Sequence, residues 1–213
     1  MVFYSVDIFW LAGFIGTIAF AISGYLLGVR KDLDWVGIFI VAMLTANGGG
    51  MLRDVLVGKT PAVLTDLSAF LIVLGVVVFS LITRIHRFAS LEGRLFFVLS
   101  DSVGLVAFSI TGAQIGLEHE LSLFGVIVLA LLTATGGGII RDILLNEVPT
   151  LLNSGFYGSI AIIVGVCLHF LEQLSISSGL AVSILFLLAL MLRMTAHFRN
   201  WHLPKVKKYP PTT

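Results

Sequence analysis

The sequence predicts an all-α integral membrane protein with seven transmembrane helices, formed by two inverted three-helix repeats and a seventh helix. The prediction rests on the composition, the spacing of the apolar runs and an internal repeat. The chain of 213 residues is 58% hydrophobic and 12% charged, with a mean hydropathy of +1.06. A typical soluble domain is about 25% charged, so most of this chain is expected to lie in a bilayer. The net charge of +1 offers no basic surface for nucleic acid.

Seven apolar runs are long enough to cross a bilayer, which takes about 20 helical residues. Lys and Arg gather on the cytoplasmic side of membrane proteins, so their positions predict the orientation. If the spans alternate in direction, ten of these residues fall on one side and only Lys59 on the other, while Arg53 and Arg141 lie inside spans. The N-terminus is therefore predicted outside and the C-terminus in the cytoplasm. The predicted spans are 8–29, 34–57, 66–83, 95–117, 121–145, 156–171 and 178–197.

An internal repeat emerges when the sequence is shifted by 88 positions. TANGGGMLRDVL at 45–56 then aligns with TATGGGIIRDIL at 133–144, and Pro61 aligns with Pro149. Each repeat contains three spans, and because three is odd the second repeat must run in the opposite direction. Proteins of this kind place substrate or ion sites near the membrane midplane, between the repeats.

We interpret the chain as a single membrane domain that contains both repeats. The seventh span has no counterpart in the repeat, and a basic tail follows it. The predicted parts are repeat 1 at 8–83, repeat 2 at 95–171, the extra helix at 178–197 and the tail at 198–213, within one domain at 1–213.

Both repeats carry the motif GGGxxRD on their second span. Three consecutive glycines leave the backbone unshielded and allow the helix to bend or unwind. The carbonyl groups exposed at such a bend can coordinate a cation, so we predict a pore beside the two motifs. The alternative is that the glycines only permit close helix packing. The predicted bends are Gly48, Gly49, Gly50, Gly136, Gly137 and Gly138.

Each glycine motif ends in a pair of opposite charges, Arg53–Asp54 in repeat 1 and Arg141–Asp142 in repeat 2. Adjacent residues on a helix do not face each other, so we expect each charge to pair with another helix or with a backbone carbonyl. Two interpretations stay open. The charges either line the pore wall or form buried pairs that fix the helix packing.

Other polar residues inside the spans are further candidates for the pore wall. Asp101 aligns with Gly13 and has no acidic counterpart, so it either pairs with an arginine or lines the cytoplasmic vestibule. Hydroxyl groups can replace part of a cation's hydration shell, although they also bond to carbonyls of their own helix. The remaining candidates are Ser23, Thr45, Asn47, Thr111, Thr133 and Thr135.

The remaining features predict lipid contact rather than chemistry. No nucleophile–base pair and no metal-ligand spacing is present, so we expect neither an enzyme nor a metal or cofactor site. The single cysteine, Cys167, lies in an apolar run and cannot form an intramolecular disulfide. The tail joins Trp201 to three lysines, which predicts contact with anionic lipid headgroups.

With seven spans, two inverted repeats and GGGxxRD on spans two and five, the sequence resembles the prokaryotic trimeric intracellular cation (TRIC) channels. The resemblance covers roughly residues 5–200. It implies a homotrimer in a prokaryotic cell (inner) membrane, with one pore inside each protomer. It also implies permeation by K⁺ with some Na⁺, through a pore lined by glycine-bent second and fifth helices. By motif match, the two glycine triplets are the bends, and the two Arg-Asp pairs are the adjoining charged positions.

The leading functional interpretation is a passive channel for monovalent cations, chiefly potassium. The alternative is a secondary transporter of a small metabolite such as an amino acid, because inverted repeats are equally typical of transporters. A transporter usually needs a titratable coupling site near the midplane. Outside the Arg-Asp pairs, and apart from Asp34 and Asp66 at the first positions of their spans, Asp101 is the only acidic residue within a span. It lies toward one end, which favours the channel.

Overall fold

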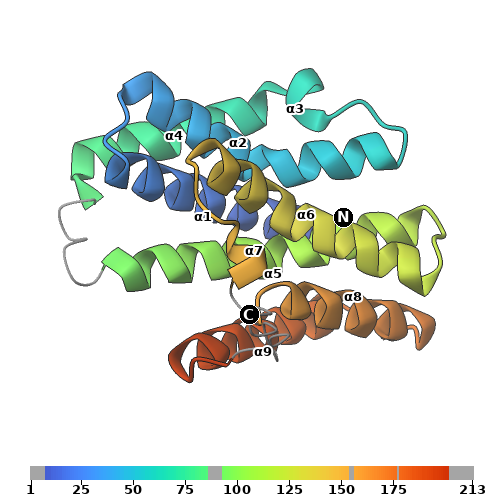
Figure 1. The fold of residues 1–213 in the computed structure, drawn as a ribbon. Coiled ribbons are helices and arrows are strands. Elements are labelled where there is room, and N and C mark those ends of the chain that lie inside the picture. Colours follow the sequence, from blue (N-terminus) through green and yellow to red (C-terminus); the bar gives the residue numbers. More distant parts are fainter. Residues whose placement is uncertain (1–7, 86–92, 154–155, 177, 202–213) are drawn as a thin grey trace, which may run out of the picture.

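The computed structural model describes residues 8–85, 93–153, 156–176 and 178–201, and its secondary structure there is helical (Figure 1). The lysines of the predicted lipid-binding tail lie outside these residues. Seven of the helices match the predicted spans to within two residues at each end. These are α1 (Ile8–Arg30), α2 (Trp35–Leu56), α4 (Leu67–Thr83), α5 (Gly93–Glu118), α6 (Leu123–Leu144), α8 (Gly158–Gln173) and α9 (Gly179–Phe198).

Helix length follows the apolar runs. Five helices, α1, α2, α5, α6 and α9, are long and apolar enough to cross a membrane, whereas α4 and α8 have only 17 and 16 residues. A short helix precedes each of these two, α3 (Ala62–Thr65) before α4 and α7 (Thr150–Asn153) before α8. The shorter span with its preceding helical turn is therefore a feature of both repeats.

The repeat is also visible in how the helices begin and end. Asp34 caps α2 and Ser122 caps α6, each accepting a hydrogen bond from the backbone N–H three residues further on. Such side chains satisfy backbone groups that the first helical turn leaves without partners. After the same two helices the chain turns through a left-handed residue, Gly58 in repeat 1 and Asn146 in repeat 2, at aligned positions. Gly and Asn are the residue types that adopt this conformation most readily.

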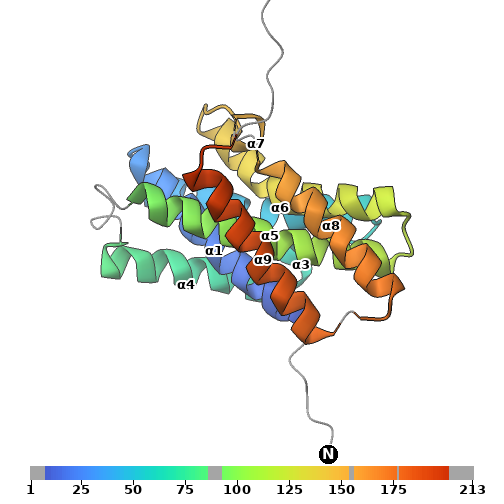
Figure 2. The same cartoon turned by 90° about the horizontal axis from the view of Figure 1, so that it is seen from below.

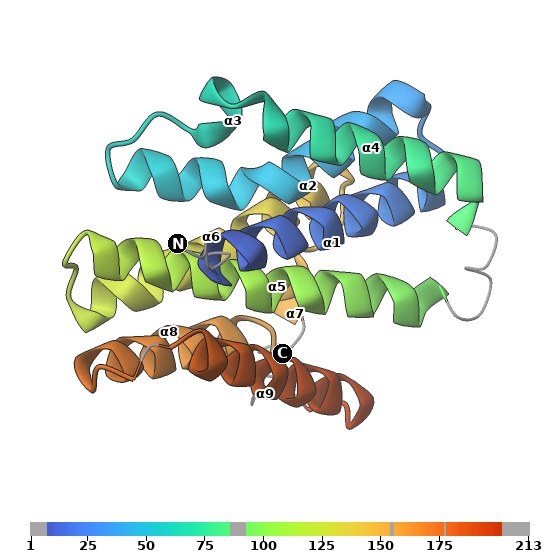
Figure 3. The same ribbon diagram turned by 180° about the vertical axis from the view of Figure 1, so that it is seen from behind.

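The two repeats pack against each other as equivalent halves. Helix α1 packs on α5, and α2 packs on α6 (Figure 3). The third span of each repeat, α4 or α8, packs on the first two helices of its own repeat. The unrepeated α9 lies across α5 and α8 (Figure 2). This arrangement confirms the predicted fold class of two three-helix repeats and an added helix.

An ion pair joins the two repeats outside the spans. Lys31, just after α1, pairs with Glu147, just after α6. The hydrogen bond from the Lys31 ammonium lowers the pKa of the Glu147 carboxyl below its ordinary value. Both residues follow the predicted cytoplasmic ends of their helices, which agrees with the alternating spans.

Helices α2 and α6 cross at their glycine triplets with the two backbones in direct contact. A Cβ atom on Gly49 would overlap the carbonyl oxygen of Thr133, and one on Gly137 would overlap that of Thr45. Both helices continue without interruption through the triplets, so the backbone is not unwound there. The glycines therefore allow the close packing that was the alternative in the sequence analysis, while their role as bends stays a prediction.

Replacing Gly49 or Gly137 by alanine is expected to destabilise the protein, because each methyl group would push α2 and α6 apart. Overpacking of this kind costs about 1–3 kcal/mol. Thermal unfolding of the purified protein in detergent should show a lower midpoint for both variants. Gly75→Ala in α4 is the matched control, since a Cβ atom there has no neighbour within 4 Å. An unchanged midpoint for Gly49→Ala would contradict the close crossing.

Two Arg-Asp pairs and a cavity between the repeats

A buried ionic cluster connects α1, α5 and α6. Arg141, whose side chain is 0% exposed, donates hydrogen bonds from Nη1 to Asp101 Oδ1 at 2.8 Å and to Ser23 Oγ at 2.7 Å. Its Nε donates to Asp142 Oδ1 at 2.8 Å, and its Nη2 lies 2.8 Å from the same oxygen. Ser23 in turn donates to Asp101 Oδ1 at 3.2 Å. We refer to these four residues as the Arg141 cluster.

The second carboxylate of the cluster also fixes the chain after α6. Asp142 Oδ2 accepts hydrogen bonds from the backbone N–H and the hydroxyl of Thr150, at 2.8 and 3.0 Å. In repeat 1, Asp54 Oδ2 accepts in the same way from the backbone N–H of Ala62 at 3.0 Å. Each aspartate thus ties the end of its glycine helix to the short helix that follows.

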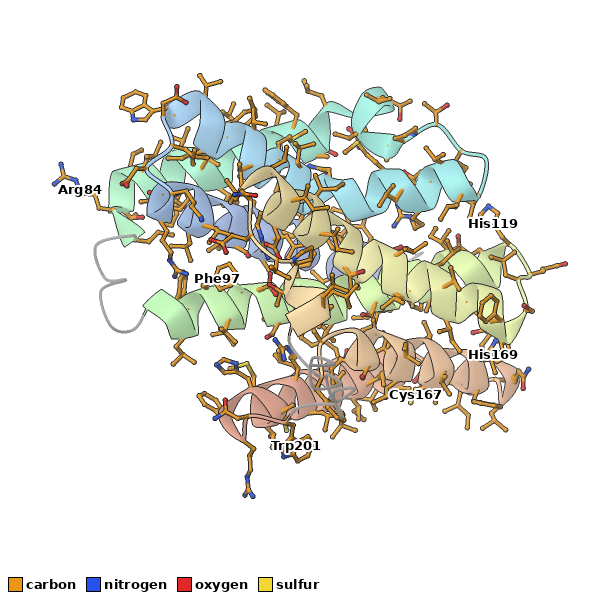
Figure 4. The ribbon with its side chains drawn as sticks, in the orientation of Figure 1. Arg84, Phe97, His119, Cys167, His169 and Trp201 are labelled. Carbon is orange, nitrogen blue, oxygen red and sulfur yellow. The ribbon has the colours of Figure 1, made fainter. Side chains whose placement is uncertain are left out.

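Aromatic side chains and two further arginines surround the Arg141 cluster. The guanidinium groups of Arg141 and Arg30 lie 5.2 and 5.6 Å from the ring centre of Phe97, which lies between α1 and α5 (Figure 4). The guanidinium of Arg193 on α9 lies 5.0 Å from the ring centre of Tyr157. Cations over aromatic faces at these distances are attracted electrostatically.

The equivalent pair in repeat 1 has a different environment. Arg53 donates from Nε and Nη2 to Asp54 Oδ1, at 2.9 and 2.7 Å, as Arg141 does to its own aspartate. Its Nη1 makes no hydrogen bond to any residue that the structure describes. The Arg53 side chain is 17% exposed, whereas that of Arg141 is 0% exposed. The two pairs are therefore alike in local geometry but differ in burial and in their further partners.

A cavity of about 770 Å³ opens beside Arg53. Helices α1 to α5 contribute to its wall, so it lies between the two repeats. We refer to it as the Arg53 cavity. Its polar lining residues are Thr17, Asn47, Arg53, Asp54, Asp66, Ser68, Thr111, Gln114 and Glu118, and its lining glycines are Gly13 and Gly50.

The other predicted pore residues fall into two groups. Asn47 and Thr111 line the Arg53 cavity. Thr45, Thr133 and Thr135 are buried, do not line it, and donate their hydroxyl hydrogen bonds to carbonyls of their own helices at 2.6 to 2.7 Å. Pore lining by these three threonines stays a prediction.

Two expectations from the sequence need correction. The adjacent Arg and Asp do pair with each other, because the long arginine side chain folds back along the helix to reach its neighbour. Arg193 is one of the ten Lys and Arg residues that the sequence analysis assigned to the cytoplasmic side, but it is 4% exposed and its guanidinium group packs against Tyr157. A charged residue inside a span usually has a functional or structural role. Because Arg193 lies within the predicted span 178–197, the sequence could have indicated such a role for it. Tyr157 aligns with Ala69 and carried no such indication.

Comparison with known proteins gives the family. A family model described as "Glycine transporter" matches residues 10–84 and 98–173, one segment for each repeat. The chain is 34% identical to the UPF0126 membrane protein YvgT of Bacillus subtilis over 194 residues, 91% of this chain and 94% of the relative. It is 31% identical to a prokaryotic TRIC channel crystallised in 0.5 M KCl, with a TM-score of 0.84, over 92% of this chain and 98% of that one.

The chain belongs to the prokaryotic TRIC channel family. A further match is the trimeric intracellular cation channel orthologue from Rhodobacter sphaeroides, at 29% identity and a TM-score of 0.84, over 91% of this chain and 98% of that one. The family consists of multi-pass membrane channels and not of enzymes. This confirms the resemblance found in the sequence and the classification as a membrane protein.

Within this TRIC family member, removing one partner of the Arg141–Asp101 pair should be strongly destabilising. Arg141→Gln leaves Asp101 buried without its countercharge, which costs about 3–5 kcal/mol. Arg53→Gln should cost less, because that pair is partly exposed to water. Thermal unfolding in detergent measures both changes.

The double variant Arg141→Gln with Asp101→Asn should recover part of the loss, since no unpaired charge then remains between them. Strictly additive losses in this cycle would contradict the coupling that the geometry indicates.

Proposed function

We propose that this protein is a passive channel for monovalent cations, chiefly K⁺ with some Na⁺, with one pore inside each protomer. We further propose that it acts as a homotrimer in a prokaryotic inner membrane, with its C-terminus in the cytoplasm. Family membership supports the first proposal, since the similar solved proteins are described as cation channels. The orientation rests on the Lys and Arg distribution.

The Arg53 cavity is the observation that carries the proposal of a pore. Its lining includes Asn47 and Gly50, which lie on either side of the Gly49 contact where α2 crosses α6. Its charged lining residues are one arginine, Arg53, and three carboxylates, those of Asp54, Asp66 and Glu118. An excess of negative charge in a cleft raises the local concentration of cations. The cavity therefore has the charge expected of an entrance for cations.

The proposed path continues past the glycine crossing to the Arg141 cluster. There the buried Arg141 and Asp101 occupy the position that repeat 1 leaves open. A cation cannot share this space with the guanidinium group, because like charges repel strongly in surroundings of low dielectric constant. In this proposal the Arg141 cluster closes the path, and conduction requires Arg141 to leave Asp101 and Ser23.

Single-channel recording from purified protein in planar bilayers tests the channel. Unitary K⁺ currents are expected. Solute uptake coupled to protons or Na⁺, in the absence of such currents, would overturn the proposal.

Ser23→Ala tests the position of the gate without changing any charge. The variant removes one acceptor from Arg141 Nη1, and a hydrogen bond to a charged group contributes about 1.5–3 kcal/mol. The open probability should therefore rise by about tenfold or more. Thr83→Ala is the matched control, since that exposed hydroxyl bonds only within its own helix. An open probability unchanged by Ser23→Ala would place the gate elsewhere.

A second candidate function is transport of glycine, which the description of the matching family model favours. A carrier moves solute in a fixed ratio with its coupling ion and gives no unitary current. Liposomes loaded with K⁺ distinguish the two functions. A channel releases K⁺ without external glycine, whereas a carrier takes up labelled glycine against its gradient.

A further inference from the structure

We propose that the Arg53 cavity is a binding site for a small carboxylate, and that an amino-acid zwitterion binds there better than a simple anion. The proposal does not depend on which ion permeates, and it rests on the second candidate function for the choice of glycine as a ligand. What it adds is the site, the Arg53 cavity, and the groups that hold the ligand there. The choice of this cavity rests on a comparison of the two repeats. In repeat 2, the structure shows which chemical groups accept hydrogen bonds from Nη1 of the equivalent arginine, Arg141.

The two arginines use their nitrogen atoms in the same way, with one exception. In both, Nε and Nη2 face the Oδ1 atom of the following aspartate. In Arg141, Nη1 donates to the carboxylate of Asp101 at 2.8 Å and to the hydroxyl of Ser23 at 2.7 Å. In Arg53, Nη1 has no hydrogen-bond acceptor among the described residues. The two N–H groups of Arg53 Nη1 therefore have no acceptor among these residues, and Arg141 shows that a carboxylate oxygen and a hydroxyl fit this nitrogen.

The two hydrogen-bond partners of Arg141 Nη1 have different counterparts around Arg53. Thr111 aligns with Ser23 and lines the cavity, so a hydroxyl group is present in both repeats. Gly13 aligns with Asp101 and also lines the cavity, so the carboxylate of repeat 2 has no counterpart in repeat 1. A Cβ atom on Gly13 would meet only the Thr111 methyl group, at an ordinary 3.7 Å. A carboxylate from solution can therefore approach Arg53 from the side that Asp101 occupies in repeat 2.

A second replacement enlarges the space around Arg53. Ala69 stands in the cavity wall at the position aligned with the buried Tyr157 of repeat 2. The cavity volume of about 770 Å³ lies within the range of small-molecule sites. An amino acid therefore fits with room for ordered water.

The charges of the wall define the class of ligand further. Arg53 is outnumbered by Asp54, Asp66 and Glu118, so an anion without a positive group meets net repulsion. A zwitterion places its carboxylate on Arg53 and its ammonium group near the acidic residues. An anion with several charges is disfavoured for two reasons. The acidic residues repel it, and Nε and Nη2 of Arg53 already donate to Asp54.

Saturation-transfer NMR of the full-length protein in detergent tests the site with three probes: glycine, acetate and methylammonium. This method detects ligands that bind weakly. We expect glycine to give the strongest signal, acetate a weaker one that glycine displaces, and methylammonium a signal that does not depend on Arg53. Binding of methylammonium without any binding of glycine or acetate would overturn the proposal.

Two variants remove the carboxylate site in independent ways. Arg53→Gln removes the donor and should weaken glycine binding by about tenfold or more, the loss that corresponds to one charge-assisted hydrogen bond. Gly13→Asp places a carboxylate of the chain at the position aligned with Asp101, where it would pair with Arg53 in place of the ligand. This variant should abolish the glycine signal. Gly13→Ala is the matched control and should bind glycine normally, since its methyl group has an ordinary contact only.

The oligomeric state on gel filtration shows whether each variant is folded, so a loss of binding in a folded Gly13→Asp protein supports the site. Glycine binding that survives in both folded variants refutes it. Failure of this proposal is separable from failure of the channel, because K⁺ currents of the wild type in glycine-free solution do not require the carboxylate site.

Discussion

The backbone contact of α2 with α6 is the constraint on which the rest of the structure depends. Because Gly49 and Gly137 each face a carbonyl oxygen of the opposite helix, the two glycine helices have one possible crossing point. The Arg-Asp pairs follow the triplets at the same spacing in both helices. Fixing the crossing therefore fixes both charge pairs on opposite sides of it. Each aspartate then holds the start of the next short helix, so the crossing also determines where α4 and α8 begin.

The repeats are equivalent in backbone but not in chemistry. Substitution of a few side chains between aligned positions, Gly13 against Asp101 and Ala69 against Tyr157, turns one half into a cavity and the other into a packed ionic cluster. The added helix α9 strengthens the difference, because its Arg193 lies against Tyr157 and has no counterpart in repeat 1. The difference between a half with a cavity and a half with a buried ionic cluster therefore comes from a few side chains and not from the backbone, which is similar in the two repeats.

The sequence predicted the scaffold well because hydrophobic length and the aligned repeat are properties of segments. Span limits, helix order and the pairing of repeats all follow from them. The contacts of single polar side chains depended on three-dimensional packing, which the alignment does not contain. Asp101 illustrates the limit, since both an arginine partner and a vestibule position were compatible with its place in the chain. Thr45 and Thr133 illustrate it again, because their hydroxyl groups bond to their own helices.

The different partners of Arg53 and Arg141 bear on the choice between a channel and a carrier. A channel needs one closed point, and in the proposed channel the Arg141 cluster is that point, formed from the chain itself. A carrier must close alternately on both sides. On the Arg53 side, Gly13 stands at the position that Asp101 occupies in the Arg141 cluster, so a carboxylate at that position has to come from a bound ligand. A conformational change follows a ligand only as far as the ligand binds the two states differently. In the two proposals taken together, closure of the Arg53 side depends on a bound carboxylate and opening of the Arg141 side does not, so a small carboxylate would modulate the proposed channel.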